Sequence, residues 1–437
     1  MRAVFLTAGA AGMYCGSCMH DNALAKELRR QGVDCLLQPV YTPIRTDAES
    51  VADPHVFFGG IHIYLLQQLP WLRWVPAPIR RTLDWTPIIR LATRRTHSTD
   101  ANKLGDLAVS MLRGAQGRQA EEVQRLADWL AEDVQPQALV LSNLLIGGGL
   151  PTIRKRLPDA KVIVVLQGDD IFLDHLPDGP RREAIQLCQE LVSHVDHFLV
   201  NSQFYADKMG ALFRIPKEKF EVAPLSIDIA PFRELDTFEP TSSPSSSKPQ
   251  FRLGYMARIA PEKGFHHLVD AFVSLANSEE HHDLTLHAAG WLGDSNKDYF
   301  AEQQRKIRQA GLDERFTYHG SPDLSDKVGF LRTLDLLSVP TDYHEPKGLF
   351  VLESLAAGVP VVQPDHGAFR ELLESTGGGV LVPPGSPSKL GSTIEELKRE
   401  PSRLSQLATR GRQSVHEKHT VEIAAAQLKR LLFDLDD

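Results

Sequence analysis

The sequence predicts an α/β protein made of two doubly wound domains, each with a parallel sheet covered by helices. Short apolar, β-branched runs alternate with amphipathic helical segments, which is the pattern of parallel α/β sheets. A serine- and proline-rich stretch at 241–249 interrupts this alternation, and the same pattern restarts after it. The chain has 437 residues, which is more than one typical hydrophobic core holds.

The first half of the chain carries alternating elements before that break. Strands are expected at 3–7, 35–40, 138–141, 162–166 and 197–200. Helices are expected at 19–31, 118–132, 181–194 and 203–213. The strands are short and rich in branched apolar residues, because helices cover both faces of a parallel sheet.

The second half repeats this organisation. Strands are expected at 251–256, 284–288, 316–319, 336–339 and 359–362. Helices are expected at 265–277, 297–310, 325–333 and 350–357, with a last helix at about 421–435. We therefore expect domains at 1–235, with an insertion at about 41–120, and at 251–420, joined by a linker at 236–250. Two such halves imply a ligand cleft beyond the carboxyl ends of their strands.

The composition excludes several classes of protein. A net charge of −8 argues against nucleic acid as a partner, and four cysteines do not make a disulfide framework. No apolar run approaches the roughly 20 residues of a spanning helix. The apolar start of the chain is interpreted as a buried strand rather than a secretory signal, so a cytoplasmic protein is expected.

The segment around Glu345 and Glu353 is the most informative part of the sequence. It is interpreted as a loop, a short helix and a buried strand, with Pro346 in the first helical turn and Gly358 ending the helix in a left-handed conformation. The helix would open beside Gly348, where its amides and positive dipole end favour an anion. Amides for phosphate and carboxylates for hydroxyls suit a sugar nucleotide.

A second segment, 254–264, carries two cations at the expected carboxyl edge of the same sheet. Arg258 and Lys263 flank a loop between a strand and a helix. Arg offers a planar fork and Lys a point charge, so together they can neutralise a diphosphate. The alternative is a surface ion pair between Arg258 and Glu262.

These segments resemble a known family. Glu345 to Glu353 resembles the E-x7-E signature of retaining glycosyltransferases, and 352–358 (Leu-Glu-Ser-Leu-Ala-Ala-Gly) with 359–362 (Val-Pro-Val-Val) resembles glycosyltransferase family 4. The segment 254–264 is similar to the Gly-x-x-x-Arg…Glu-Lys-Gly segment of that family. The alternative is an ordinary helix with a surface glutamate at each end.

The resemblance implies a fold and a reaction. The fold is the GT-B architecture, in which two Rossmann-like domains face a cleft and the last helix, 421–437, crosses back onto the first, acceptor-side domain. The reaction moves a sugar, with retention, from a nucleotide-diphosphate sugar to a carbohydrate, lipid or small-molecule acceptor. No protein nucleophile, metal or other cofactor is expected.

The resemblance also implies roles for single residues. Arg258, Lys263 and the amides of Gly348 and Leu349 would stabilise the leaving diphosphate. Glu345 would orient hydroxyls of the donor sugar, and Glu353 would hold the ribose. Lys347 replaces a more usual aromatic residue, which points to an altered donor preference.

The glycine-bearing turn after the first strand is expected to approach the donor phosphate. Gly16 takes the place of the second glycine of the family's Gly-Gly pair, and Gly16 and Ser17 are the candidate contacts. Cys15 replaces the first glycine and forms a C-x-x-C with Cys18. These thiols are interpreted as small residues that line the loop, and a redox or metal role is the alternative.

Four further residues are candidates for contacts with sugar or acceptor. Gln167 stands near a position where the family commonly has a histidine that contacts the donor sugar, and Asp169 and Asp170 follow it. The alternative for the two aspartates is capping of the helix that follows them. His366 is a candidate for the sugar or phosphate, and a solvated loop histidine is the alternative.

The segment 61–95 interleaves tryptophans with arginines. Three interpretations stay open for it, in this order: an inserted subdomain that packs its tryptophans internally, an acceptor-binding surface, and peripheral contact with an anionic membrane at the inner face. Its prolines exclude one long amphipathic helix.

Three rival functions remain beside a retaining glycosyltransferase. A GT-B phosphorylase would turn over without a nucleotide, and a catalytically silent sugar-nucleotide-binding protein would bind a donor without hydrolysing or transferring it. A dinucleotide oxidoreductase is disfavoured, because no G-x-G-x-x-G followed by an acidic residue roughly 20 positions later appears after a strand.

Overall fold

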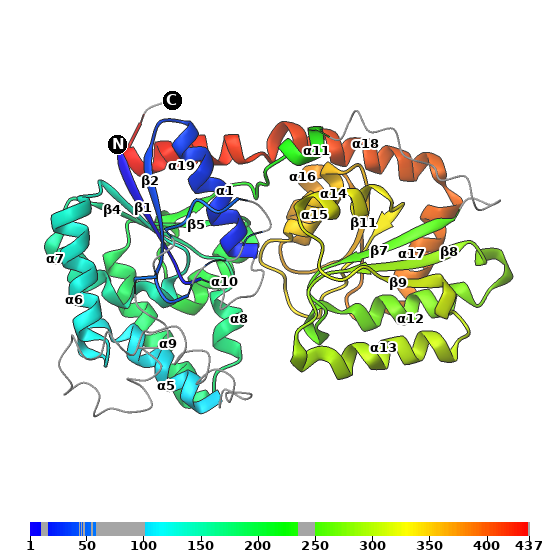
Figure 1. The fold of residues 1–437 in the computed structure, drawn as a ribbon, viewed down its shortest axis with the longest axis horizontal. Coiled ribbons are helices and arrows are strands. Elements are labelled where there is room, and N and C mark those ends of the chain that lie inside the picture. The colour runs from blue at the N-terminus through cyan, green and yellow to red at the C-terminus, as the bar shows by residue number, and fades with distance from the viewer. Residues whose placement is uncertain are drawn as a thin grey trace. The chain divides into compact units, whose positions relative to one another are not determined.

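The computed structural model describes residues 1–9, 16–42, 44, 46, 49–53, 56–57, 101–234 and 250–435. Cys15, the segment 61–95 and all but the last residue of the expected linker lie outside these residues. The chain forms two compact units (Figure 1). The first comprises Met1–Val200, Tyr205–Ala223 and Ala425–Asp437, and the second comprises Asn201–Phe204 and Pro224–Ala424.

The first unit is built on a parallel sheet in the order β2-β1-β3-β4-β5-β6. Its strands are β1 (Arg2–Thr7), β2 (Asp34–Pro39), β3 (Ala138–Leu141), β4 (Lys161–Val165), β5 (His197–Val200) and β6 (Phe220–Val222). Ala3 of β1 pairs with Cys35 on one side and with Ala138 on the other. The chain therefore moves outward in opposite directions from β1, which makes the gap between β1 and β3 the topological switch point of this sheet.

Helices connect these strands, and their apolar faces complete the core of the unit. They are α1 (Gly16–Arg30), α5 (Ala101–Leu112), α6 (Ala120–Trp129), α7 (Leu150–Arg156), α8 (Asp169–Asp174), α9 (Asp178–Leu191) and α10 (Gln203–Phe213). Right-handed crossovers that leave β1 in opposite directions place helices on opposite faces of the sheet. Val4, Leu139 and Ile163 are consequently fully buried.

The second unit repeats the plan in the order β12-β11-β10-β7-β8-β9, again with parallel neighbours. Its strands are β7 (Phe251–Met256), β8 (Leu284–Ala289), β9 (Phe316–Tyr318), β10 (Leu336–Leu337), β11 (Val361–Pro364) and β12 (Gly379–Val382). Its helices are α11 (Ala230–Glu234), α12 (Phe265–Ala276), α13 (Lys297–Gln309), α14 (Leu324–Arg332), α15 (Leu349–Ala356), α16 (Phe369–Thr376), α17 (Pro387–Arg399) and α18 (Pro401–Lys418). The two sheets confirm the predicted α/β class of two doubly wound parallel sheets.

The last helix, α19 (Val421–Phe433), contributes to both units, because Val421 to Ala424 group with the second unit and Ala425 onward with the first. Within the first unit, Lys429 Nζ donates to the carbonyl oxygen of Gln31 at 2.7 Å. Lys161 forms an ion pair with Asp434 in the same unit. The helix is therefore anchored to the first unit by polar contacts at its carboxyl-terminal end.

The prediction that Pro346 lies in the first turn of α15 is wrong, although the helix opens beside Gly348 as expected. Pro346 lies in the loop, and the helix begins at Leu349. Gly348 adopts a left-handed conformation with φ +85°, which interrupts the helical run before that residue. The predicted end is confirmed, because Gly358 has φ +81° and follows the last turn. The strand expected at 359–362 forms at Val361–Pro364 instead.

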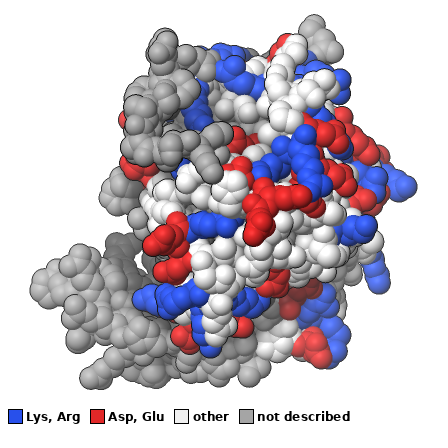
Figure 2. Space-filling model, turned by 90° about the vertical axis from the view of Figure 1, so that its right-hand side faces the viewer, with Lys and Arg blue, Asp and Glu red and all other residues white. Residues whose placement is uncertain are grey.

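Positive and negative side chains are mixed on one face of the molecule. On the face shown in Figure 2, Lys and Arg are interspersed with Asp and Glu rather than gathered by sign. This face therefore offers no broad positive field of the kind that binds nucleic acid. Among the residues that the structure describes, no helix combines the length and the apolar character that crossing a bilayer requires.

Candidate functional site

The loop after β7 and the loop after β10 bring Lys263 and Glu345 into direct contact in the second unit. The Nζ atom of Lys263 lies 2.8 Å from Oε2 of Glu345. The hydroxyl of Tyr343 donates to the same oxygen at 2.6 Å, and it also contacts Lys263. Only 13% of the Lys263 side chain and 8% of the Glu345 side chain is exposed. The structure thus places two of the predicted residues in one buried, hydrogen-bonded cluster.

The charges in this cluster keep Glu345 ionised. Burial by itself would raise the pKa of Glu345, but Lys263, the hydroxyl of Tyr343 and the charge of Lys347 outweigh it and hold the pKa below its usual range. Burial and the neighbouring carboxylate raise the pKa of Tyr343 well above its ordinary value. The cluster therefore contains an anionic carboxylate, a cationic amine and a neutral phenol at neutral pH.

Arg258 lies in the same loop as Lys263 but remains more accessible. Its Nη2 atom is 3.3 Å from Oε1 of Glu262, and 41% of its side chain is exposed. This is the surface ion pair considered as the alternative above. Such a pair contributes about 0–1 kcal/mol, so an anionic ligand can replace Glu262 at little cost. Burial and Glu345 raise the pKa of Tyr343, and the charge of Arg258 acts in the opposite direction with a smaller effect. The guanidinium is therefore close enough to the cluster to interact with it electrostatically.

The turn before α16 holds the backbone of Glu345. The amide of Ala368 donates to the carbonyl oxygen of Glu345 at 2.8 Å. Gly367, which precedes Ala368, has φ +60°, and a Cβ atom at this position would meet the backbone of the same glutamate. Helix α15 begins at Leu349, so the amides that open the helix have no partner within it.

Glu353 lies inside α15 and forms a second buried ion pair. Its Oε1 atom accepts a hydrogen bond from Nζ of Lys327 at 2.6 Å, and 16% of its side chain is exposed. Lys327 belongs to α14, so the pair joins two neighbouring helices. The carboxylate is the group that a ribose hydroxyl would contact under the role expected for Glu353.

His366 is half-buried beside the Glu345 loop. Its Nε2 atom lies 2.9 Å from the carbonyl oxygen of Thr341, and its ring stacks on His344 with centroids 5.1 Å apart. Burial lowers the pKa of His366, so the ring is neutral at neutral pH. Its Nδ1 atom is buried and has no hydrogen-bond partner among the described residues. That unsatisfied nitrogen is a group that a ligand could satisfy.

The first unit has a cavity of about 520 Å³ at the switch point of its sheet. It is lined by residues that follow β1, β3 and β4 and by parts of α1 and α5, among them Thr7, Ser17, Asn143, Gln167 and Asp169. Ligands of doubly wound sheets bind at this position beyond the carboxyl ends of the strands. The structure therefore brings three of the predicted residues of the first unit, Ser17, Gln167 and Asp169, to one cavity.

Gln167 and Asp169 bind helix α1 and the segment that follows β3. The side-chain amide of Gln167 donates to Asp21 at 3.2 Å and to the carbonyl oxygen of Ser142 at 2.8 Å. Asp169 accepts from the amide of Leu144 at 2.7 Å and from that of Gln167 at 3.3 Å. These contacts connect the ends of adjacent strands and fix the wall of the cavity.

Asp170 is part of a separate buried contact. It accepts from the hydroxyl of Tyr205 at 2.6 Å and pairs with Lys208 at 2.5 Å. The hydroxyl of Tyr205 in turn accepts the amide of Gly168 at 2.8 Å. Both partners lie on α10, so Asp170 joins the start of α8 to that helix. These contacts give Asp170 a structural role that could not be predicted from the sequence.

Burial raises the pKa of Asp169 to about 7, whereas its backbone hydrogen bonds act in the opposite direction. An unfolded chain would have an ordinary aspartate pKa of about 4. Between these values the folded protein binds more protons than the unfolded one, so stability falls as the pH rises and levels off above pH ~7.

We expect Asp169→Asn to remove this dependence. Relative to the variant, the wild type should lose roughly 2–3 kcal/mol of unfolding free energy between pH 5 and pH 8. Urea unfolding of both proteins at these two pH values measures the difference. Parallel pH profiles for the two proteins would contradict the prediction.

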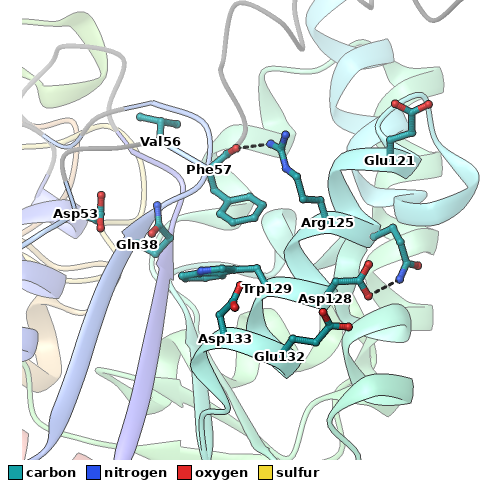
Figure 3. A pocket seen from close by; sticks show the side chains of 11 residues that line it. Gln38, Asp53, Val56, Phe57, Glu121, Arg125, Asp128, Trp129, Glu132 and Asp133 are labelled. Atoms are coloured by element: carbon teal, nitrogen blue, oxygen red, sulfur yellow. Dashed lines mark hydrogen bonds between the residues drawn. The ribbon is translucent and has the colours of Figure 1, made fainter. Parts of the chain in front are cut away.

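A wider cavity of about 800 Å³ lies elsewhere in the first unit, beside α6 (Figure 3). The rings of Trp129 and Phe57 form part of it, with centroids 5.2 Å apart. Among the lining residues that the structure describes, Arg125 is the single cation, and it donates to the carbonyl oxygen of Phe57 at 2.9 Å. These walls would repel a diphosphate, so this larger cavity is not the candidate donor site. The carboxylates that line it are Asp53, Glu121, Asp128, Glu132 and Asp133.

Several residues that contact the candidate site residues were not predicted from the sequence. Tyr343 lies between the two predicted charges of the second unit, and its position two residues before Glu345 is a signal that could have identified it. Lys327 and Tyr205 reach their carboxylates from other helices, for which sequence spacing holds no signal. Cys18 is a buried thiol, and its expected partner in the C-x-x-C lies outside the described residues.

Comparison with known proteins matches the second unit to a family model. Residues 239–414 match the model described as Glycosyl transferases group 1. The chain is 26% identical to 2-deoxystreptamine glucosyltransferase of Streptomyces kanamyceticus over 41% of this chain and 46% of that protein. It is 27% identical to D-inositol 3-phosphate glycosyltransferase of Arthrobacter sp. (strain FB24) over 54% of this chain and 53% of that protein. The chain thus spans about half the length of the curated relatives that it matches.

Solved structures resemble the chain over its whole length. Anabaena HepE in complex with UDP matches with a TM-score of 0.68 and 16% identity, covering 100% of both chains. Sucrose-phosphate synthase from Thermosynechococcus elongatus matches with a TM-score of 0.67 and 16% identity, covering 99% of this chain and 100% of that one. At these identities the likeness shows a shared fold, and it confirms the predicted GT-B class.

Proposed function

We propose that this chain, which belongs to the group 1 glycosyl transferases, moves a sugar with retention from a nucleoside-diphosphate sugar to an acceptor. The observation that carries the proposal is the contact between Lys263 and Glu345 at the carboxyl edge of the second sheet, with Arg258 and the start of α15 nearby. This arrangement offers fixed positive charge to a leaving diphosphate and a carboxylate to sugar hydroxyls.

In this proposal the cations of the second unit bind the diphosphate, and its carboxylates bind hydroxyl groups. Negative charge develops on the diphosphate as the bond to the sugar breaks, and Arg258, Lys263 and the amides of Gly348 and Leu349 stabilise it. Glu345 stays ionised and accepts hydrogen bonds from hydroxyls of the donor sugar, which positions the sugar for attack. Glu353 accepts from the ribose, and His366, whose Nε2 donates to the carbonyl oxygen of Thr341, offers its unsatisfied Nδ1 as an acceptor to a sugar hydroxyl.

The first unit supplies the acceptor site in this proposal. Its cavity of about 520 Å³ is large enough for a small sugar or a part of a larger acceptor, and it combines apolar walls with Gln167 and Asp169. Gly16 and Ser17 stay candidates for contact with the donor phosphate. The nature of the acceptor stays open among carbohydrate, lipid and small molecule, because the two relatives above are named for different acceptors, 2-deoxystreptamine and D-inositol 3-phosphate.

Donor binding is tested by the melting temperature of the full chain in the presence of sugar nucleotides. UDP-glucose is a suitable first ligand, since a structure of Anabaena HepE contains it. A donor at 100 times its dissociation constant should stabilise the wild type by about 2.7 kcal/mol. In Arg258→Ala, we expect less than about half of that shift, because the phosphate contact is lost while a surface ion pair contributes little to stability.

Arg399→Ala is a matched control, because Arg399 also pairs with a glutamate one helical turn away and is 57% exposed. Its donor-induced shift should equal that of the wild type. Equal shifts in all three proteins would remove the diphosphate assignment. A donor that binds without slow hydrolysis or transfer would indicate a silent binding protein, and turnover without any nucleotide would indicate a phosphorylase.

A further inference from the structure

Two histidines and an aspartate converge beside the candidate donor site. His266 and His267 lie in the first turn of α12, and Asp342 lies in the loop that leads to Tyr343 and Glu345. The Nε2 atom of His267 is 2.7 Å from Oδ1 of Asp342, and the Nε2 atom of His266 is 3.6 Å from Oδ2. One ligand atom from each residue lies within 4.8 Å of the others.

The surrounding backbone holds these three residues in place. The amide of Asp342 donates to the carbonyl oxygen of Glu262 at 3.1 Å, which joins the two loops independently of any side chain. The Nδ1 atom of His266 lies 2.9 Å from the hydroxyl oxygen of Tyr299. When Nδ1 carries the ring proton and donates it to this oxygen, Nε2 keeps its lone pair for a metal ion. A partner of this kind on the other ring nitrogen is typical of histidines that bind metals.

The ligand set and its exposure suit a transition-metal ion. Two neutral imidazoles and one carboxylate form a common set for Zn²⁺, with a fourth position left for water. The side chains of His266, His267 and Asp342 are 26%, 17% and 45% exposed, so an ion can reach them from solvent.

A second cluster in the same unit shows what makes the first one different. Glu280, His281 and Glu395 are also close enough to share an ion. There, Arg399 pairs with Glu280 at 2.5 Å and with Glu395 at 2.8 Å, and Lys398 lies 3.3 Å from Nδ1 of His281. These cations already neutralise the carboxylates and would repel a metal ion.

We propose that His266, His267 and Asp342 bind a divalent transition-metal ion of the Zn²⁺ type, and that the ion ties the first turn of α12 to the loop of Glu345. Lys263 precedes α12, and Glu345 follows Asp342 in the same loop. The ion would therefore connect the segment that contains Lys263 to the segment that contains Glu345. It takes no part in bond breaking. The proposal is independent of the transfer reaction, because it concerns binding and stability alone.

The test uses the full chain after removal of metals with a chelator. Zn²⁺ is titrated in competition with a chromophoric chelator, and the melting temperature is measured with and without the ion. We expect one bound equivalent and a higher melting temperature for the wild type. Loss of one of three ligands should weaken binding by more than the roughly 10–100-fold that loss of an outer partner costs. His267→Gln and Asp342→Asn should both show this loss.

The matched control is His281→Ala, which alters the second cluster and should bind one equivalent as tightly as the wild type. Melting temperatures of the metal-free variants report whether each variant folds. Co²⁺ provides an independent readout, since its visible absorption reports nitrogen and oxygen ligands and should disappear in His266→Gln. Unchanged Zn²⁺ affinity in His267→Gln and Asp342→Asn, or an equal loss in His281→Ala, would overturn the proposal.

Discussion

Lys263→Met is expected to destabilise the second unit by roughly 3–5 kcal/mol and to abolish sugar transfer, because removal of one partner from a buried pair leaves the other charge uncompensated. Glu345 is 6% exposed, so its ionised form needs nearby stabilising groups. Without Lys263, only the weaker effects of Tyr343 and Lys347 would stabilise that form against burial. The variant also loses a cation that the diphosphate requires. Chemical unfolding and initial rates of transfer measure the two effects.

A double variant separates the structural effect from the catalytic one. Lys263→Met combined with Glu345→Gln leaves no buried charge of this pair, so it should recover most of the stability lost in Lys263→Met alone. It should remain inactive, because both functional groups are missing. If the two single changes instead add in stability, the pair is not coupled and the 2.8 Å contact does not describe the protein in solution.

Gly367→Ala is expected to lower the rate of transfer by about 100-fold or more, since displacements of about 1 Å at a site have effects of this size. A Cβ atom at this position would lie 2.6 Å from the carbonyl oxygen of Glu345 and 2.7 Å from its amide nitrogen. The clash is with backbone atoms, so Glu345 itself must move. Steady-state rates and the melting temperature measure the change.

Gly385→Ala is the matched control for Gly367→Ala. Gly385 has φ +63°, close to the +60° of Gly367, but nothing described lies within 4 Å of the position of its Cβ. This variant should therefore show only the strain of a left-handed residue, of order 1 kcal/mol, with unchanged transfer. Equal losses of activity in both variants would show that strain, rather than displacement of Glu345, is responsible.

The sequence was sufficient for elements that contain a clear apolar run. Strand β7 forms where its apolar run lies in the chain, at Phe251–Met256, and Lys263 and Glu345 meet because parallel strands end at one edge of the sheet. Strands β6 and β12 were missed. Both are short edge strands with partly exposed residues, Glu221 interrupts the apolar pattern of β6, and the apolar run of β12 at 380–382 lies between glycines and prolines.

Side-chain partners that are distant in sequence could not be predicted. The contact of Asp170 with Tyr205 and Lys208 depends on how α10 packs, and periodicity holds no information about that. Pro346 was wrongly placed in the first turn of α15 because proline is common there, whereas the left-handed Gly348 determines where the helix begins. Tertiary contacts and one backbone dihedral angle decided these cases.

The pairing of Lys263 with Glu345 before any ligand arrives has a consequence for selectivity. Glu345 already offsets the charge of Lys263, so inorganic phosphate meets a partly neutralised amine, and it brings no sugar hydroxyl to the carboxylate. A molecule that carries both anionic oxygens and hydroxyl groups compensates both partners at once. The ligand-free protein should therefore bind the abundant simple anions of a cell weakly and bind a ligand with both groups more tightly.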